Sequence, residues 1–117
     1  MIIKNRKNKI VILNVEKYSG IKKFIGLMFK KSPKKALLFE FSSPVNRKIH
    51  SFFCKPFLAV WLNINNEIVE VKLINKLGIY SPKKNFCKLL EIPLTKKYYL
   101  SIKKILKRKD LNTFVEN

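Results

Sequence analysis

The stretch Leu58-Ala-Val-Trp-Leu-Asn-Ile64 is followed by Asn65-Asn66 and then by Glu67-Ile-Val-Glu-Val-Lys-Leu-Ile74. Asparagine tolerates a positive φ, so Asn65 and Asn66 suit the turn of a two-residue β-hairpin. The apolar pattern agrees with this turn, because one face of the hairpin is then apolar and the other mixed. The predicted pairs are Leu58–Leu73, Val60–Val71 and Leu62–Val69 on the apolar face, and Ala59–Lys72 and Trp61–Glu70 on the mixed face.

Further strands are predicted on both sides of this hairpin. They cover Lys9 to Val15, which is rich in β-branched residues, Lys35 to Phe41, and Phe86 to Ile92, which Pro93 stops. Between the first two, Ser19 could cap a short helix, since apolar residues recur at helical spacing up to Met28.

The segment from Thr95 to Lys109 predicts an amphipathic helix. One side carries the apolar residues Tyr98, Tyr99, Ile102, Ile105 and Leu106, and the opposite side carries Lys96, Lys97, Lys103, Lys104, Lys107 and Arg108. The apolar side should pack on a sheet. The basic side should face solvent or a partner.

Length and composition indicate one folded domain over residues 1–117, because two units would be too small to bury separate cores. There are 26 Lys+Arg and 7 Asp+Glu, a formal charge of +19. AT-rich codons raise the number of lysines, but they do not explain the shortage of acidic residues. A typical domain of this length has roughly 14 of them. The charge is therefore interpreted as partly codon bias and partly an affinity for polyanions.

The compartment is expected to be the cytoplasm. The basic N-terminus is followed by only four successive apolar residues, Ile10 to Leu13, which is too short for a signal peptide. The longest apolar tract, Phe57 to Leu62, is far below the ~20 residues of a membrane-spanning helix, so no integral membrane segment is predicted.

Several fragments stand in a recognisable order: Phe24-Ile-Gly-Leu-Met-Phe-Lys30, Ala36-Leu-Leu-Phe-Glu-Phe41, Ile49-His-Ser-Phe-Phe-Cys-Lys-Pro-Phe57, the hairpin, and Leu89-Leu-Glu-Ile-Pro93. In this order they resemble the domain of unknown function 192 family over about Tyr18 to Asp110, as a divergent member whose late glycine is replaced by Lys109. The resemblance implies a compact α+β domain with a strongly curved, barrel-like, mostly antiparallel sheet. It implies no biochemical activity.

Several kinds of site find little support. His50 and Cys54 lack a third catalytic member, and four-residue spacing in a strand-rich segment does not bring two side chains together. Cys54, Cys87 and His50 are too scattered for a structural metal site, and no Gly-rich phosphate loop is present. No cofactor is predicted. A Cys54–Cys87 disulfide remains an alternative to two packed thiols.

Glu91 is the one acidic candidate for a pocket, because it lies in an apolar strand where burial would raise its pKa. The alternative is a structural salt bridge with one of the many lysines. Glu40 should lie on the face opposite Leu37, Phe39 and Phe41 and stay solvated.

Clusters of cations occur at residues 4–9, 30–35, 83–88 and 96–109. We interpret the chain as a small soluble domain with a non-enzymatic binding or structural role. One alternative is weak, sequence-independent binding of RNA or another polyanion, with core contacts from Lys103, Lys104, Lys107 and Arg108. Lys83, Lys84 and the N-terminal cluster would extend this surface if they lie near the helix. A small-ligand pocket or an enzyme of unknown reaction is the second alternative.

Overall fold

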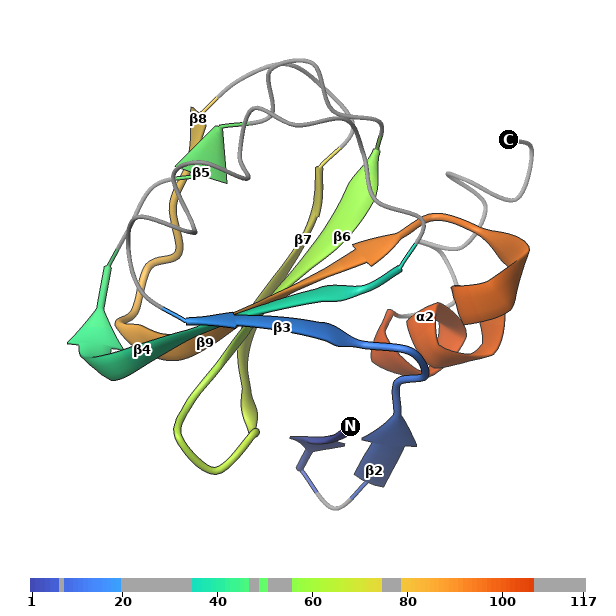
Figure 1. Ribbon diagram of the computed structural model, residues 1–117, viewed down its shortest axis with the longest axis horizontal. Helices are drawn as coiled ribbons and strands as arrows, with labels where there is room; N and C mark the ends of the chain where they lie inside the picture. The colour runs from blue at the N-terminus through green and yellow to red at the C-terminus, as the bar shows by residue number, and fades with distance from the viewer. Residues whose placement is uncertain (7, 20–34, 47–48, 51–55, 75–78, 107–117) are drawn as a thin grey trace.

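Strands dominate the part of the chain that this computed structural model describes, residues 1–6, 8–19, 35–46, 49–50, 56–74 and 79–106 (Figure 1). A 3-10 turn, η1 (Lys96–Tyr98), runs directly into the helix α2 (Tyr99–Ile105). The strands are β1 (Ile2–Asn5), β2 (Asn8–Val11), β3 (Glu16–Ser19), β4 (Leu37–Val45), β5 (Ile49–His50), β6 (Phe57–Leu62), β7 (Ile68–Ile74), β8 (Ile79–Tyr80) and β9 (Phe86–Pro93).

The main sheet has five strands in the order β3-β4-β9-β6-β7. β3 runs parallel to β4, and the other neighbours are antiparallel. Its strand direction turns strongly from β3 to β7 (Figure 1), but within the described residues these two edge strands do not pair with each other. The sheet is therefore twisted and open, and the expected barrel-like closure is only partly met. Charged residues on β3 and β7 oppose further strand pairing at both edges.

The predicted hairpin is present as β6 and β7, and four of its five predicted pairs are confirmed: Leu58–Leu73, Ala59–Lys72, Val60–Val71 and Trp61–Glu70. The fifth prediction, Leu62 opposite Val69, is wrong, because an irregularity after Trp61 pairs Leu62 with Ile68. The cause is a longer turn than expected. The backbone N–H of Asn63 donates to the Glu67 carbonyl, and Asn66 adopts the positive φ of 62°.

The strands predicted over Lys35 to Phe41 and Phe86 to Ile92 correspond to β4 and β9. The strand predicted over Lys9 to Val15 is shorter, since β2 ends at Val11 and Asn14 takes a positive φ of 50°. β2 pairs instead with β1, which the sequence patterns did not predict. The helix expected after Ser19 lies outside the described residues, and Ser19 itself ends β3.

The C-terminal helix is shorter than predicted. Leu106 has an extended backbone, so α2 ends at Ile105. Tyr98, Ile102 and Ile105 are buried as expected, whereas Tyr99 is exposed.

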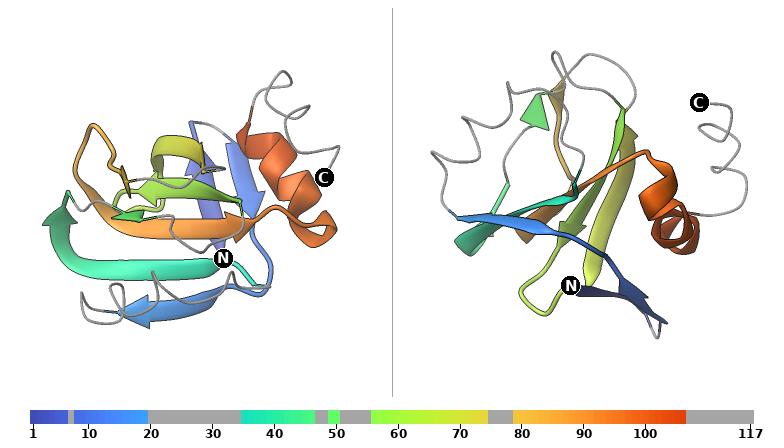
Figure 2. Two further views of the ribbon diagram at one scale, coloured as in Figure 1. Left: turned by 90° about the horizontal axis from the view of Figure 1, so that it is seen from above. Right: turned by 45° about the vertical axis from the view of Figure 1, so that its right-hand side comes forward.

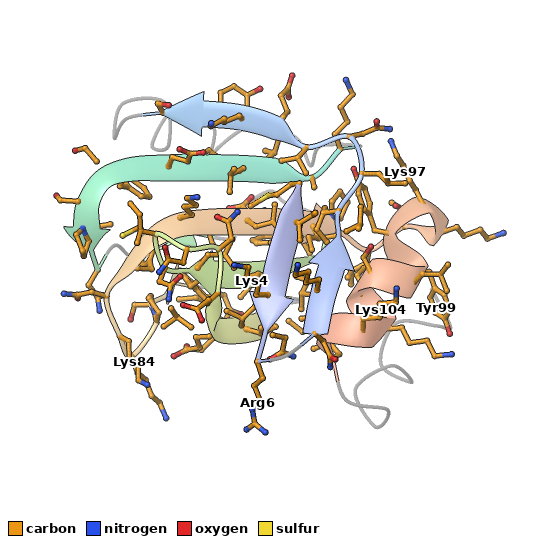
Figure 3. The ribbon with its side chains drawn as sticks, turned by 90° about the horizontal axis from the view of Figure 1, so that it is seen from below. Lys4, Arg6, Lys84, Lys97, Tyr99 and Lys104 are labelled. Carbon is orange, nitrogen blue, oxygen red and sulfur yellow. The ribbon has the colours of Figure 1, made fainter. Side chains whose placement is uncertain are left out.

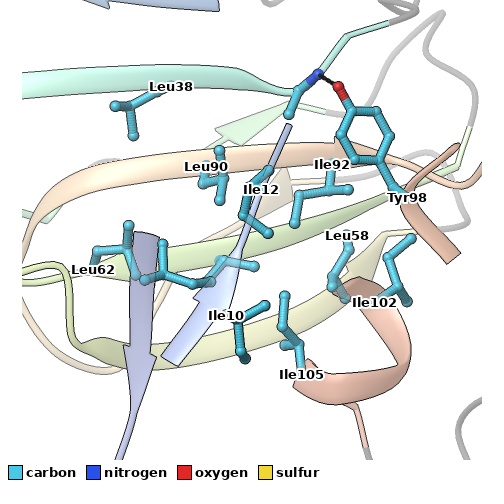
Figure 4. Close-up of a cluster of buried hydrophobic side chains, with 13 residues drawn as sticks. Ile10, Ile12, Leu38, Leu58, Leu62, Leu90, Ile92, Tyr98, Ile102 and Ile105 are labelled. Atoms are coloured by element: carbon cyan, nitrogen blue, oxygen red, sulfur yellow. Dashed lines mark hydrogen bonds between the residues drawn. The ribbon is translucent and has the colours of Figure 1, made fainter. Parts of the chain in front are cut away.

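Apolar side chains cover both faces of the sheet, which explains why every residue of β6 is buried. One face packs under the β1–β2 hairpin and α2, which lie side by side (Figure 2). This first core, drawn in Figure 4, contains Ile3, Ile10, Ile12, Ala36, Leu38, Leu58, Val60, Leu62, Leu90, Ile92, Tyr98, Ile102 and Ile105. The second core, on the opposite face, contains Leu37, Phe39, Phe41, Phe57, Ala59, Trp61, Ile74, Phe86 and Leu89.

Candidate functional site

Exposed cations gather on the β1–β2 hairpin and on the η1–α2 segment. The described residues within 1–15 and 94–106 contain seven cations and no carboxylate. We call this set the basic surface: Lys4, Arg6, Lys9, Lys96, Lys97, Lys103 and Lys104. All seven are exposed, and Figure 3 labels four of them. The remaining described residues contain six cations and five carboxylates, so the excess positive charge of the described part lies almost wholly on the basic surface.

Side chains along β1 and β2 alternate between the first core and solvent, and the cations of the hairpin lie on the solvent side. Ile3 and Ile10 pair across the two strands and are buried in the first core. Their neighbours Lys4 and Lys9 also pair directly across the strands and are exposed. Like charges directly opposite each other destabilise a strand pair, so this arrangement carries a small cost that a bound anion would remove.

The helix is held beside the hairpin by side-chain hydrogen bonds. The Tyr98 hydroxyl donates to the Leu13 carbonyl at 2.9 Å and accepts from the backbone N–H of Ala36 at 2.9 Å (Figure 4). The Ser101 hydroxyl donates to the Val11 carbonyl at 2.8 Å. Because Ile102 and Ile105 face the core, Lys103 and Lys104 are turned to solvent as predicted.

The structure brings together only some of the predicted basic residues. Lys107 and Arg108 lie outside the described residues. The N-terminal cluster lies beside α2, but Figure 3 places Lys84 at the other end of the molecule from Lys104. The backbone N–H of Lys83 donates to Glu70 at 3.0 Å, which fixes that loop near β7. The loop containing Lys83 and Lys84 therefore lies away from α2.

Glu91 lies on the central strand β9, opposite Leu37 of β4 and Ala59 of β6. It is half-buried on the side of the second core, and burial raises its pKa from 4.5 to about 7. Within the described residues no lysine pairs with it, so the predicted salt bridge is not found there. On the same face, the buried Nε1 of Trp61 also has no hydrogen-bond partner among these residues.

A cavity of about 350 Å³ that the sequence did not indicate lies between the N-terminus and the sheet. An ion pair of 3.0 Å between Lys17 and Glu40 stands at its wall, and the Lys88 ammonium donates to the Asn66 side chain. Sequence patterns missed it because its walls come from five separated segments. Its lining residues are Met1, Val15, Lys17, Leu38, Glu40, Asn66 and Lys88, and Glu91 is not among them.

The thiol and metal candidates bring no further site within the described residues. Cys87 is a buried free thiol, so it forms no disulfide. Cys54 and the side chain of His50 fall outside what is described, and the His50–Cys54 pair stays untested. The described residues hold no cluster of three His, Cys, Asp or Glu side chains that would suit a metal. In this part of the chain, no helix has the length and apolar character needed to cross a membrane.

Comparisons with known proteins give two archaeal relatives. A UPF0127 protein of Pyrococcus furiosus is 32% identical over 76 residues, which cover 62% of this chain and 65% of the relative. A UPF0127 protein of Thermococcus kodakarensis is 32% identical over 77 residues, which cover 63% of this chain and 49% of the relative. The similarity thus spans between about half and two thirds of these relatives, and their names state no activity. No family model matches the chain, and no solved structure matches it.

Proposed function

We propose that this chain is a non-enzymatic binding module that attaches to RNA or another polyanion through the basic surface, without reading sequence. The observation that carries the proposal is the charge distribution. Seven exposed cations and no carboxylate stand on two neighbouring elements, while the rest of the described chain is nearly balanced. A surface with an excess of one sign attracts a polymer of the opposite sign through its summed field.

The chemistry of the cations supports phosphate contact without base recognition. Six of the seven are lysines, whose ammonium is a point charge rather than the planar fork with which arginine reads a base or phosphate. Lys103 and Lys104 have no carboxylate partner among the described residues, so no ion pair within that part of the chain competes with a phosphate. Lys107 and Arg108 follow α2 in sequence and are included in the proposal as further contacts.

The test is a salt titration of binding to a labelled single-stranded RNA followed by fluorescence anisotropy. Each phosphate neutralised contributes about −0.7 to the slope of log affinity against log salt concentration, so four contacts give a slope of roughly −3. The double variant Lys103→Glu/Lys104→Glu should abolish measurable binding at physiological salt.

The matched control is Lys83→Glu/Lys84→Glu, which makes the same charge change in two adjacent exposed lysines far from the helix. It should retain most of the affinity. Equal losses in the two double variants, or binding that does not depend on salt, would contradict the proposal.

We also propose that the chain is a divergent member of the domain of unknown function 192 family and acts in the cytoplasm. The similarity to UPF0127 proteins supports a family of this kind, and the central strands β4 and β9 carry two of the resembling fragments. The free thiol of Cys87 is in keeping with a reducing compartment.

A further inference from the structure

Exposed apolar side chains lie among the cations of the basic surface. Ile2 and Val11 pair across the β1–β2 hairpin and are 50% and 53% exposed. Leu13, just after β2, is 57% exposed, and Leu100 on α2 is 70% exposed. Tyr99, also on α2, is partly exposed. The hairpin thus carries aliphatic side chains on both faces, although only its inner face packs on the first core.

The elements that carry these side chains are bonded together, so the exposed apolar residues of the hairpin and of α2 belong to neighbouring elements. The Val11 carbonyl accepts from Ser101, which follows Leu100 on α2. The Leu13 carbonyl accepts from Tyr98, which precedes Tyr99. Figure 3 shows Tyr99 and Lys104 both on α2, and Lys4 on the neighbouring hairpin. The hairpin and the helix therefore each carry both exposed apolar and exposed basic side chains.

This mixture selects among polyanions. A nucleic acid makes few favourable contacts with aliphatic side chains. Its phosphates bind cations, and its single-stranded bases stack on aromatic rings. Of the exposed side chains here, Tyr99 is the aromatic one, and Ile2, Val11, Leu13 and Leu100 are aliphatic. A bilayer with anionic headgroups can contact both kinds of side chain. Its phosphates attract the lysines, and the boundary with the acyl chains just below them accommodates the aliphatic side chains.

We propose that the basic surface docks on a membrane surface containing anionic phospholipids. The lysines lie at the level of the lipid phosphates, and Leu100, Leu13 and Val11 enter the interfacial region. This inference rests on the proposed function and deepens it, since it names the polyanion. It requires no membrane-spanning helix, because the domain lies on the bilayer.

The experiment uses the full chain in vesicle flotation. The two lipid probes are phosphatidylcholine vesicles that contain phosphatidylglycerol and vesicles of phosphatidylcholine alone, and single-stranded RNA is measured in parallel. We expect binding to the anionic vesicles that weakens with salt, and none to the neutral vesicles.

Two kinds of variant separate the apolar contribution from the charge. Leu13→Ser/Leu100→Ser leaves every charge in place and should weaken binding to anionic vesicles by roughly tenfold, since membrane affinity scales with the apolar area buried. Its RNA binding should not change. Lys103→Glu/Lys104→Glu should lose binding to both probes. Leu100→Ser alone, at the most exposed of these positions, is a second variant if the double one unfolds.

The outcomes distinguish the inference from the proposed function. RNA binding without binding to anionic vesicles would overturn the inference and leave the proposed function standing. Binding to neither probe at low salt would overturn both. Equal binding to neutral vesicles, or a serine variant that binds the anionic vesicles as well as the original chain, would also overturn the inference. So would a stable dimer whose formation depends on Leu13 and Leu100, because a second copy would then cover this surface.

Discussion

Replacing Glu91 by Gln should remove a large part of the pH dependence of stability. Glu91 lies between Leu37 and Ala59 on the central strand, and burial raises its pKa from 4.5 to about 7. In the folded state the Glu91 carboxyl therefore stays protonated over a pH range in which it is ionised in the unfolded state. Stability from this group is fully present below pH 4.5 and is lost as the pH rises through about 7.

The magnitude follows from the size of the shift. One pKa unit corresponds to about 1.4 kcal/mol, so the full shift of Glu91 makes the folded state roughly 3 kcal/mol less stable at high pH than at low pH. Between about pH 5 and about pH 8, the expected loss is about 2 to 3 kcal/mol. Glu91→Gln keeps the shape of the side chain and cannot ionise, so it should lack this loss and be the more stable protein at the higher pH.

The assay is urea unfolding at the two pH values, followed by the fluorescence of Trp61, the single tryptophan of the chain. The quantity that matters is the change in unfolding free energy between the two pH values, compared between the original chain and Glu91→Gln. Glu16→Gln removes an exposed carboxylate and controls for the change in net charge. If the original chain and Glu91→Gln lose the same free energy from the lower to the higher pH, the burial argument for Glu91 is refuted.

Two further changes test the packing of α2 and the charge of the hairpin. Ile102→Asp should destabilise the fold by several kcal/mol, since it places an unpaired charge where Ile102 is fully buried. The midpoint temperature of thermal unfolding should therefore fall steeply. Leu100→Asp, on the exposed side of α2, should leave this temperature almost unchanged. Lys9→Glu should raise the unfolding free energy by about 0.5 kcal/mol, because an opposite charge would then face Lys4 across the strands, and it should weaken binding to RNA in the anisotropy assay. A Lys9→Glu variant that binds RNA as tightly as the original chain would exclude the hairpin from the binding surface.

The sequence was a good guide where local patterns decide the outcome. Period-two alternation and a pair of asparagines predicted the β6–β7 hairpin, and the predicted pairs hold from Leu58 to Trp61. The prediction failed at Leu62, where Asn63 closes the turn with Glu67, because several hairpin turns suit the same residues. Helical periodicity likewise predicted that Ile102 and Ile105 are buried and that Lys103 and Lys104 are exposed.

The candidate sites depended more on long-range contacts. The sequence singled out Glu91 as an acid in an apolar strand, but its neighbours Leu37 and Ala59 come from strands far away in the chain. The basic helix was predicted, whereas its place beside β2 rests on Ser101 and Tyr98 bonding to carbonyls about 90 and 85 residues earlier.

By itself, then, the sequence determined the properties that depend on nearby residues: the central hairpin, the amphipathic helix and the excess of positive charge. Tertiary structure alone decided which of the basic clusters lie together. It placed the β1–β2 hairpin that carries Lys4 and Lys9 beside α2, and the loop of Lys83 and Lys84 away from α2. The physical reason is that the strand order β3-β4-β9-β6-β7 and the side on which the β1–β2 hairpin packs are set by burial of two apolar faces, which no local pattern encodes.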